Sequence, residues 1–134
     1  MGVKFRVNQN LFSRWSRGMA YVLGFFCADG CMIDGSAMRG KYIIFYNTDR
    51  EILEKIKIVL DAEHKIYERK DTAMSTKRKR YYMLKIGNHK LYNDLLLLGI
   101  TPNKSLNLQM PPVPNNFFNA FVRGYLDGDW CLHK

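Results

Sequence analysis

The sequence has little cysteine, little proline and no long hydrophobic run, and each shortage excludes a class of protein. It holds three cysteines in 134 residues, an odd number with no signal-peptide pattern before them. We therefore expect an intracellular protein with reduced thiols rather than a secreted disulfide scaffold. The longest apolar stretch, residues 19–28, is too short to cross a bilayer, so no membrane partner is expected. All four prolines fall within residues 101–114, which predicts a loop there.

Acidic residues are also scarce relative to basic ones. The chain has 21 lysines and arginines against 12 aspartates and glutamates, a net charge of +9. An excess of this size on one small domain indicates a polyanionic partner, most often nucleic acid. Hydrophobic residues make up 47% of the chain and charged residues 25%, the ordinary mix of a globular domain.

Hydrophobic periodicity and turn residues predict an α+β domain with an antiparallel sheet. The first helix is apolar on all sides, so we expect it to be buried and to end at Asp29-Gly30. Thr48 or Asp49 is placed to cap the second helix. Helices are expected at residues 19–28, 49–61, 90–98 and 117–128, and two hairpins from strands at residues 31–37 and 42–46, and at 65–70 and 81–86.

A repeat lies hidden at an offset of 100 residues. Residues 20–32 read AYVLGFFCADGCM and residues 120–132 read AFVRGYLDGDWCL, and the two align without a gap. Each copy carries two small residues four positions apart on one helix face, which lets helix backbones approach closely. We therefore expect the two helices to pack through the small residues Gly24, Ala28, Gly124 and Gly128.

Each copy of the repeat also places a carboxylate at the end of its helix, Asp29 in the first and Asp129 in the second. An acid at a helix C-terminus opposes the helix dipole, at a cost of about 0.3–1 kcal/mol. Two such acids side by side also repel each other. A shared divalent cation is the simplest compensation. The alternative is an ordinary C-capping Asp-Gly turn, which the repetition disfavours.

Residues 22–30 and 122–130 resemble the two nine-residue signatures of LAGLIDADG homing endonucleases, and residues 95–129 resemble the run that leads into the second signature. The resemblance implies an αββαββα fold with a saddle-shaped sheet. It also implies Mg²⁺-dependent (or other divalent-cation-dependent) phosphodiester cleavage, with double-stranded DNA rather than a small molecule as substrate. Trp130 departs from the pattern, since a glycine ends the signature. The resemblance divides the chain into a half-domain, residues 1–114, and a helix at residues 115–134 that opens a second half, which this sequence does not contain.

The same resemblance implies roles for individual residues. Asp29 and Asp129 would hold the metal ion. Lys104, 25 residues before Asp129, would stabilise charge on the phosphate or perturb the attacking water, the alternative being a solvated loop lysine. Asn47 would position a water molecule.

Basic residues cluster on or beside the expected strands, and a two-stranded ribbon fits the major groove of DNA. The predicted DNA contacts are Arg39, Lys41, Lys65, Arg69, Lys70, Lys77, Arg78, Lys79, Arg80 and Lys85. The tyrosines of these strands receive no role, because half-buried strand tyrosines are common. The spacing of the cysteines and histidines does not fit a zinc site.

Two alternatives remain open. The chain is either an endonuclease or a non-catalytic DNA- or RNA-binding module, such as a truncated relic, a transcription regulator or a relative of intron maturases. The second signature helix either folds back on the first as a monomer or takes part in a homodimer through the signature helices.

Overall fold

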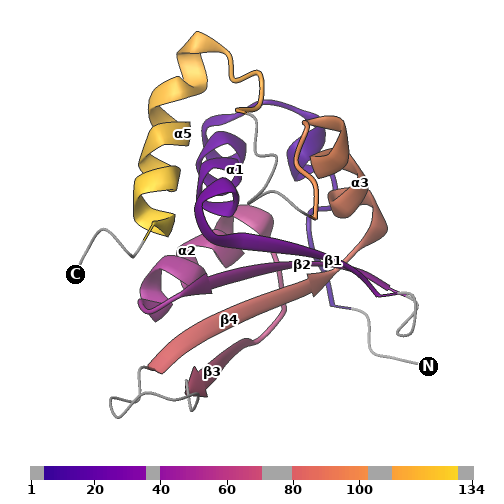
Figure 1. The fold of residues 1–134 in the computed structure, drawn as a ribbon, viewed down its shortest axis with the longest axis vertical. Helices are drawn as coiled ribbons and strands as arrows, with labels where there is room; N and C mark the ends of the chain where they lie inside the picture. Colours follow the sequence, from indigo (N-terminus) through magenta and orange to yellow (C-terminus); the bar gives the residue numbers. More distant parts are fainter. Residues whose placement is uncertain (1–4, 36–39, 71–79, 103–109, 130–134) are drawn as a thin grey trace.

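The computed structural model describes residues 5–35, 40–70, 80–102 and 110–129. In this part of the chain the fold is α+β with one four-stranded antiparallel sheet, as the sequence predicts. In chain order the elements are η1 (Leu11–Ser13), α1 (Arg17–Asp29), β1 (Gly30–Gly35), β2 (Gly40–Asn47), α2 (Arg50–Leu60), β3 (Ile66–Lys70), β4 (Arg80–Gly87), α3 (His89–Leu97) and α5 (Asn115–Gly128) (Figure 1).

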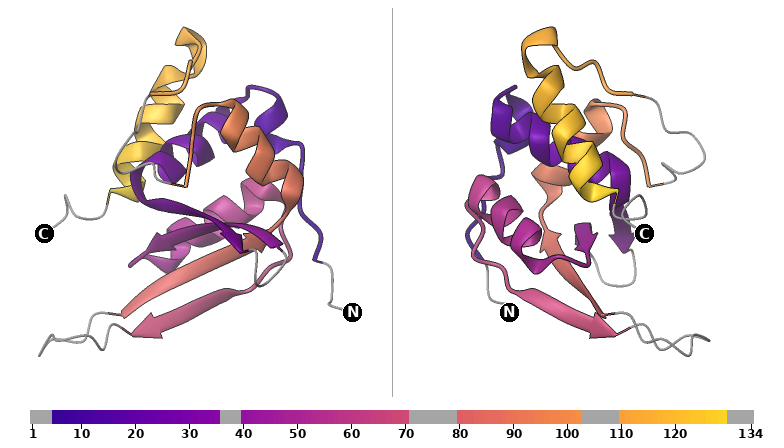
Figure 2. Two further views of the ribbon diagram at one scale, coloured as in Figure 1. Left: turned by 45° about the vertical axis from the view of Figure 1, so that its right-hand side comes forward. Right: turned by 90° about the vertical axis from the view of Figure 1, so that its left-hand side faces the viewer.

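The strand order in the sheet is β1-β2-β4-β3. The outer pairs, β1 with β2 and β3 with β4, are the two expected hairpins. The pairing of β2 with β4, in which Phe45 lies opposite Leu84, joins the hairpins at the centre. Helices α1, α2 and α3 pack on one face of this sheet, and α5 packs on α1 (Figure 2).

Alternation of side chains along the strands separates the two faces of the sheet. The helix-bearing face carries Met32, Ile43, Phe45, Leu84 and Ile86, which are buried with the apolar residues of α1 and α2. We call the opposite side the open face, because none of the described helices packs on it. By the strand register its side chains are Cys31, Ile33, Tyr42, Ile44, Tyr46, Tyr67, Arg69, Tyr81, Met83 and Lys85.

Helix α1 is buried along most of its length, as its apolar sequence predicts. Ser16 caps it by accepting a hydrogen bond from the backbone N–H of Met19 at 3.0 Å. The helix ends at Asp29 as expected, but Gly30 does not adopt the left-handed conformation of a typical C-terminal glycine. Its backbone is extended (φ −92°) and begins β1. Glycine is required there because a Cβ would collide with the ring of Phe26.

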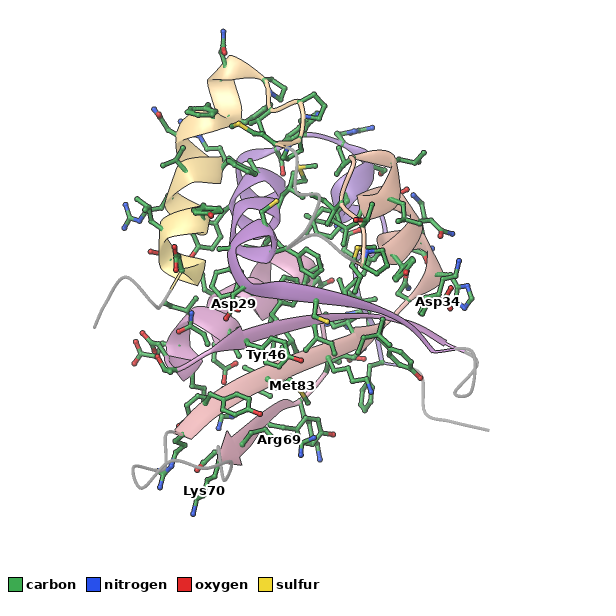
Figure 3. The ribbon with its side chains drawn as sticks, in the orientation of Figure 1. Asp29, Asp34, Tyr46, Arg69, Lys70 and Met83 are labelled. Atoms are coloured by element: carbon green, nitrogen blue, oxygen red, sulfur yellow. The ribbon has the colours of Figure 1, made fainter. Side chains whose placement is uncertain are left out.

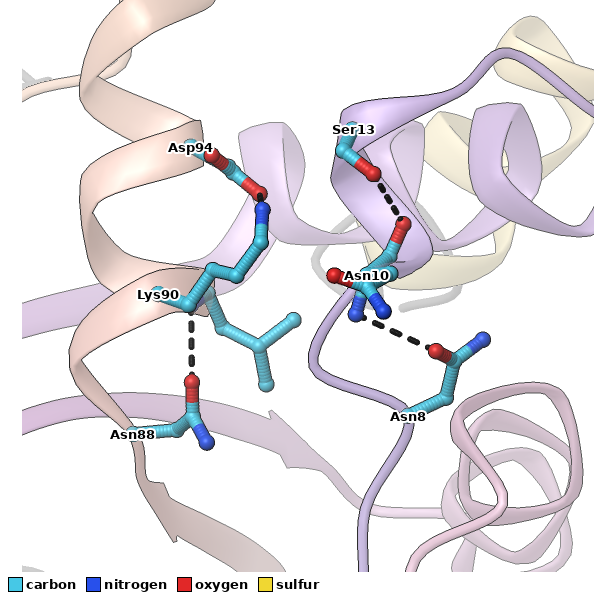
Figure 4. A network of polar contacts seen from close by, with 7 residues as sticks. Asn8, Asn10, Ser13, Asn88, Lys90 and Asp94 are labelled. Atoms are coloured by element: carbon cyan, nitrogen blue, oxygen red, sulfur yellow. Dashed lines mark hydrogen bonds and ion pairs between the residues drawn. The ribbon is translucent and has the colours of Figure 1, made fainter.

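Local polar contacts cap the starts of α2 and α3. Asp49, one of the two expected caps, accepts a hydrogen bond from the N–H of Glu51 at 3.0 Å at the start of α2. At the start of α3, Asn88 accepts from the N–H of Leu91 at 2.9 Å, and Lys90 pairs with Asp94 at 2.7 Å (Figure 4). Within the described segments, no helix combines the length and the apolarity needed to cross a membrane.

Candidate functional site

Helices α1 and α5, which carry the two copies of the repeat, pack with their backbones in direct contact. A Cβ on Gly24 would collide with the carbonyl oxygen of Phe121, and a Cβ on Gly124 would collide with that of Tyr21. Tyr21 and Phe121 are themselves 100 positions apart, so the repeat makes the same contact in both directions. The glycines allow backbone to touch backbone, which any side chain would prevent.

The two signature helices also end side by side. A Cβ on Gly128 would lie 3.1 Å from the Cβ of Ala28 and 2.8 Å from the carbonyl oxygen of Phe25. Because Ala28 and Gly128 directly precede Asp29 and Asp129, both aspartates leave the interface at the same end. Both are partly exposed there. Figure 3 shows Asp29 where α1 passes into β1, above the strand that carries Tyr46.

Asp29 lies within electrostatic reach of the open face. The pKa of Tyr46 is raised above its ordinary value by burial first, and then by the neighbouring Cys31, Tyr81 and Asp29, while Arg69 opposes the shift. Apart from Asp29, all of these residues belong to the open face. The carboxylate therefore stands at the corner where the helix interface meets that face.

A polar clamp holds the end of α5 in place. The hydroxyl of Tyr21, on α1, donates to Oδ2 of Asp127 at 2.6 Å. Asn47, at the end of β2 and buried, donates from Nδ2 to the carbonyl oxygen of Asp127 at 3.2 Å, and its Oδ1 accepts from the N–H of Asp49 at 2.8 Å. Burial, followed by the hydrogen bond to Asp127, raises the pKa of Tyr21 well above its usual range. Both ends of the Asn47 amide are thus engaged within the fold, and Asp127, which its Nδ2 contacts, lies two positions before Asp129.

The chemistry of the two aspartates suits a hard divalent cation. Mg²⁺ is commonly held by one or two protein carboxylates, with water and substrate phosphates completing its coordination. Among the described residues, no group of three or more His, Cys, Asp or Glu side chains could enclose a metal ion. Asp29 and Asp129 therefore fit an ion that phosphate and water help to hold, and do not form a closed structural site.

The basic residues predicted to contact DNA divide between the two faces of the sheet. Arg69 and Lys85 lie on the open face. Lys41 lies on the helix-bearing face, with its Nζ 3.4 Å from Oδ1 of Asn93 on α3. Lys70 and Arg80 share the helix-bearing face and are exposed, and Arg80 pairs with Glu68 at 2.8 Å.

Lys65 directly precedes β3 and is exposed. Other predicted residues lie outside the described part of the chain: Arg39, Lys77, Arg78, Lys79 and Lys104.

Four tyrosines that received no role from the sequence share the open face. Tyr42 and Tyr46 come from β2, Tyr81 from β4 and Tyr67 from β3. In Figure 3, Tyr46, Met83 and Arg69 follow one another across neighbouring strands. Tyr82 points the other way and packs against the core. The period-two pattern within β4 is the signal that separates Tyr81 from Tyr82.

The amino-acid sequence also matches a known protein family. A family model for the LAGLIDADG-like domain matches residues 18–103, from the start of α1 to beyond α3. No curated protein matches the chain. The matched segment contains the first signature, all four strands and Asn47, and it stops before α5. Since the match spans more than half of the sequence, the chain belongs to the LAGLIDADG-like domain family, which is of the homing-endonuclease type.

Proposed function

We propose that this chain binds DNA and cleaves its phosphodiester backbone with the help of Mg²⁺ or another divalent cation. The observation that carries the proposal is the shared end of α1 and α5. There the aspartates of two repeated signatures emerge together at the corner of an open, four-stranded sheet. A carboxylate pair beside an exposed sheet suits metal-assisted phosphodiester hydrolysis.

In this proposal Asp29 and Asp129 hold the ion. When bound, the ion would polarise the scissile phosphate and lower the pKa of a water ligand. Tyr21 and Asn47 act through Asp127, by fixing the end of α5 and so the position of Asp129. Lys104 keeps its proposed role as a cation near the phosphate.

The net charge of +9 favours DNA binding along the chain as a whole. Arg69 and Lys85 are the predicted contacts that the open face carries. We expect Lys41 to contribute less to DNA binding, because its ammonium group also lies 5.3 Å from the ring centre of Tyr92 on α3.

We further propose that α5 opens a second unit of the same kind. Val22, Phe25 and Phe26 of α1 are fully buried against the core. Their counterparts 100 positions later, Val122, Tyr125 and Leu126, are 36–47% exposed. A second sheet packed on α5 would bury these side chains, as the first sheet buries those of α1. In the proposed division, residues 1–114 form one half and residues 115–134 begin the other.

A second candidate function is nucleic-acid binding without cleavage. It is favoured because no group of three or more metal-ligating side chains lies among the described residues. Binding needs only the sheet and the basic residues, whereas cleavage needs both carboxylates. The two functions give opposite results in one experiment.

The experiment is relaxation of supercoiled plasmid in Mg²⁺ or EDTA, run beside a gel shift with the same DNA. We expect nicking that EDTA abolishes and that Asp29→Asn and Asp129→Asn reduce by at least about 100-fold, without loss of DNA binding. Asp34→Asn is the matched control, because Asp34 is an exposed acid near the other end of β1 (Figure 3). Binding without Mg²⁺-dependent nicking by the unchanged protein would reject the nuclease and favour the binding module.

A further inference from the structure

We propose that the hydroxyl of Tyr46 donates a hydrogen bond to the scissile phosphate of the bound DNA and so takes a direct part in its cleavage. The inference rests on the proposed function for the reaction and for the role of Asp29 and Asp129 as metal ligands. It goes further in assigning a phosphate-binding side chain beside those ligands, one that received no role from the sequence.

The polar residue expected beside the metal ion, Asn47, is turned away from the open face. Its side chain is buried, donates to the carbonyl oxygen of Asp127 at 3.2 Å and accepts from the N–H of Asp49 at 2.8 Å. Successive side chains of a strand point to opposite faces, so the residue before it, Tyr46, points to the open face. Tyr46 is also partly exposed. The end of β2 therefore presents a phenol, and not an amide, to DNA on that face.

The register of the sheet brings Tyr46 next to Asp29. Gly30 lies opposite Phe45 in the pairing of β1 with β2, so Asp29 and Tyr46 occupy the next position on the two sides. Figure 3 shows the two residues one below the other, where α1 passes into the sheet. Asp29 is also among the neighbours that raise the pKa of Tyr46, after burial, which is the largest cause. A phosphate drawn to an ion on Asp29 would thus come to the same corner of the sheet as the phenol.

A neutral phenol suits the chemistry of this corner. Tyrosine is protonated at neutral pH, so Tyr46 has an O–H group to donate. Hydrogen bonds to an ionised acceptor such as phosphate are stronger than those between neutral groups. The phenol adds no negative charge to a site that already holds two carboxylates. It keeps its proton throughout and stabilises charge on a phosphate oxygen while a water molecule attacks phosphorus and the P–O bond to the leaving group breaks.

Two neighbours on the open face support the ring of Tyr46. The rings of Tyr46 and Tyr81 lie with their centres 6.2 Å apart, inclined at 53°. Arg69 lies opposite Tyr81 on the outer strand β3 and is exposed. Its guanidinium is near enough to Tyr46 to oppose the rise in the pKa of the phenol. The ring is therefore packed in place, and a cation that can attract the DNA backbone stands on the side away from Asp29.

The test compares Tyr46→Phe with the unchanged full-length chain in the nicking of supercoiled plasmid, with protein in excess so that all DNA is bound. The loss of a hydrogen bond to a charged group is expected to slow nicking by about 10- to 150-fold. DNA affinity in EDTA and the melting temperature should not change, because the ring stays in place. The matched control is Tyr82→Phe, which removes the hydroxyl of a tyrosine on β4 that packs against the core. This control should nick DNA at the unchanged rate.

A second measurement does not depend on cleavage. The chain is labelled with 3-fluorotyrosine, and the ¹⁹F signal of Tyr46 is identified by its loss in Tyr46→Phe. Mn²⁺, a paramagnetic ion that broadens the signals of nearby nuclei, is then added with a short DNA duplex, because phosphate helps to hold the ion. We expect Mn²⁺ to broaden the Tyr46 signal in the unchanged protein and in Asp34→Asn, but not in Asp29→Asn.

The outcomes separate this inference from the proposed function. Nicking by Tyr46→Phe at the unchanged rate, or a Tyr46 signal that Mn²⁺ leaves sharp, would overturn the inference and leave the proposed cleavage intact. Weaker DNA affinity with unchanged nicking of the bound DNA would also overturn it, because Tyr46 would then serve recognition and not the reaction. If the unchanged protein does not nick DNA in Mg²⁺, both the proposed function and the inference are rejected.

Discussion

At the scale of single residues, Asp127 shows how the fold fixes the proposed metal ligand Asp129 through its neighbours. Its side chain is held by Tyr21 of α1 and its carbonyl group by Asn47 of β2. These partners come from elements that are far apart in sequence, so the end of α5 cannot move without breaking contacts to both. Asp129 follows two residues later, and its position depends on the same contacts.

Replacement of Tyr21 by phenylalanine tests this clamp. The Tyr21→Phe variant loses the hydrogen bond to Asp127, and we expect its free energy of unfolding to fall by about 1–2 kcal/mol. The pKa of Tyr21 is raised in the fold, so the folded state favours the neutral phenol. The stability it contributes is present below about pH 10, the ordinary pKa of tyrosine, and is lost as the pH rises above that value.

Urea unfolding at neutral pH and near pH 10.5 measures both effects. The variant should lose less stability than the unchanged protein between the two pH values. Tyr125→Phe, which removes the hydroxyl of a partly exposed tyrosine on α5, should match the unchanged protein in both. Equal stability and equal pH dependence for Tyr21→Phe would show that the hydrogen bond contributes nothing.

The sequence predicted the local contacts at this scale and missed the distant ones. The Asp49 cap follows from residue type and from its position before a periodic segment. The link from Asn47 to Asp127 spans 80 residues and has no local signature. Its existence depends on how α5 lies against β2, which is decided by the packing of the whole chain.

At the scale of elements, the interface between α1 and α5 depends on two glycines. For Gly24→Ala we expect a destabilisation of about 2 kcal/mol or more, because the added methyl group would meet the Phe121 backbone, which cannot move aside as a side chain can. Gly18→Ala in the same helix is the control. Its Cβ would approach only the side chain of Val59, at 2.9 Å, and alanine favours helix formation there. Thermal and urea unfolding compare the two, and equal stabilities would show that α5 does not pack closely on α1 in solution.

The helices, strands and hairpins were predictable because hydrophobic periodicity is a local property. The repeat at an offset of 100 also predicted which helices meet and through which glycines. The faces of the strands were harder to assign. In β2 the residues Ile43, Ile44 and Phe45 are all buried, so both faces are apolar and the alternation is lost. The sequence therefore did not predict on which face of the sheet the tyrosines lie.

At the scale of the whole molecule, three of the described surfaces differ in composition. The helix-bearing face of the sheet is taken up by the core, the open face carries tyrosines with two cations, and one side of α5 exposes apolar residues. The exposed side chains of α5 include Phe118, Val122, Tyr125 and Leu126. The second unit proposed above would bury this apolar surface of α5, whereas the helix-bearing face of the sheet is already covered by the core of this chain.

Oligomeric state follows from the same arrangement. A two-fold dimer built through two α1 helices would need Gly24, but the backbone of α5 in the same chain already covers that residue. We therefore expect sedimentation equilibrium to give the mass of one chain. A monomer presents one open face and one pair of aspartates, so its cleavage of duplex DNA should be slow and should produce nicks rather than double-strand breaks. A dimer, or efficient double-strand cleavage by a demonstrated monomer, would show that the two signature helices are used differently in solution.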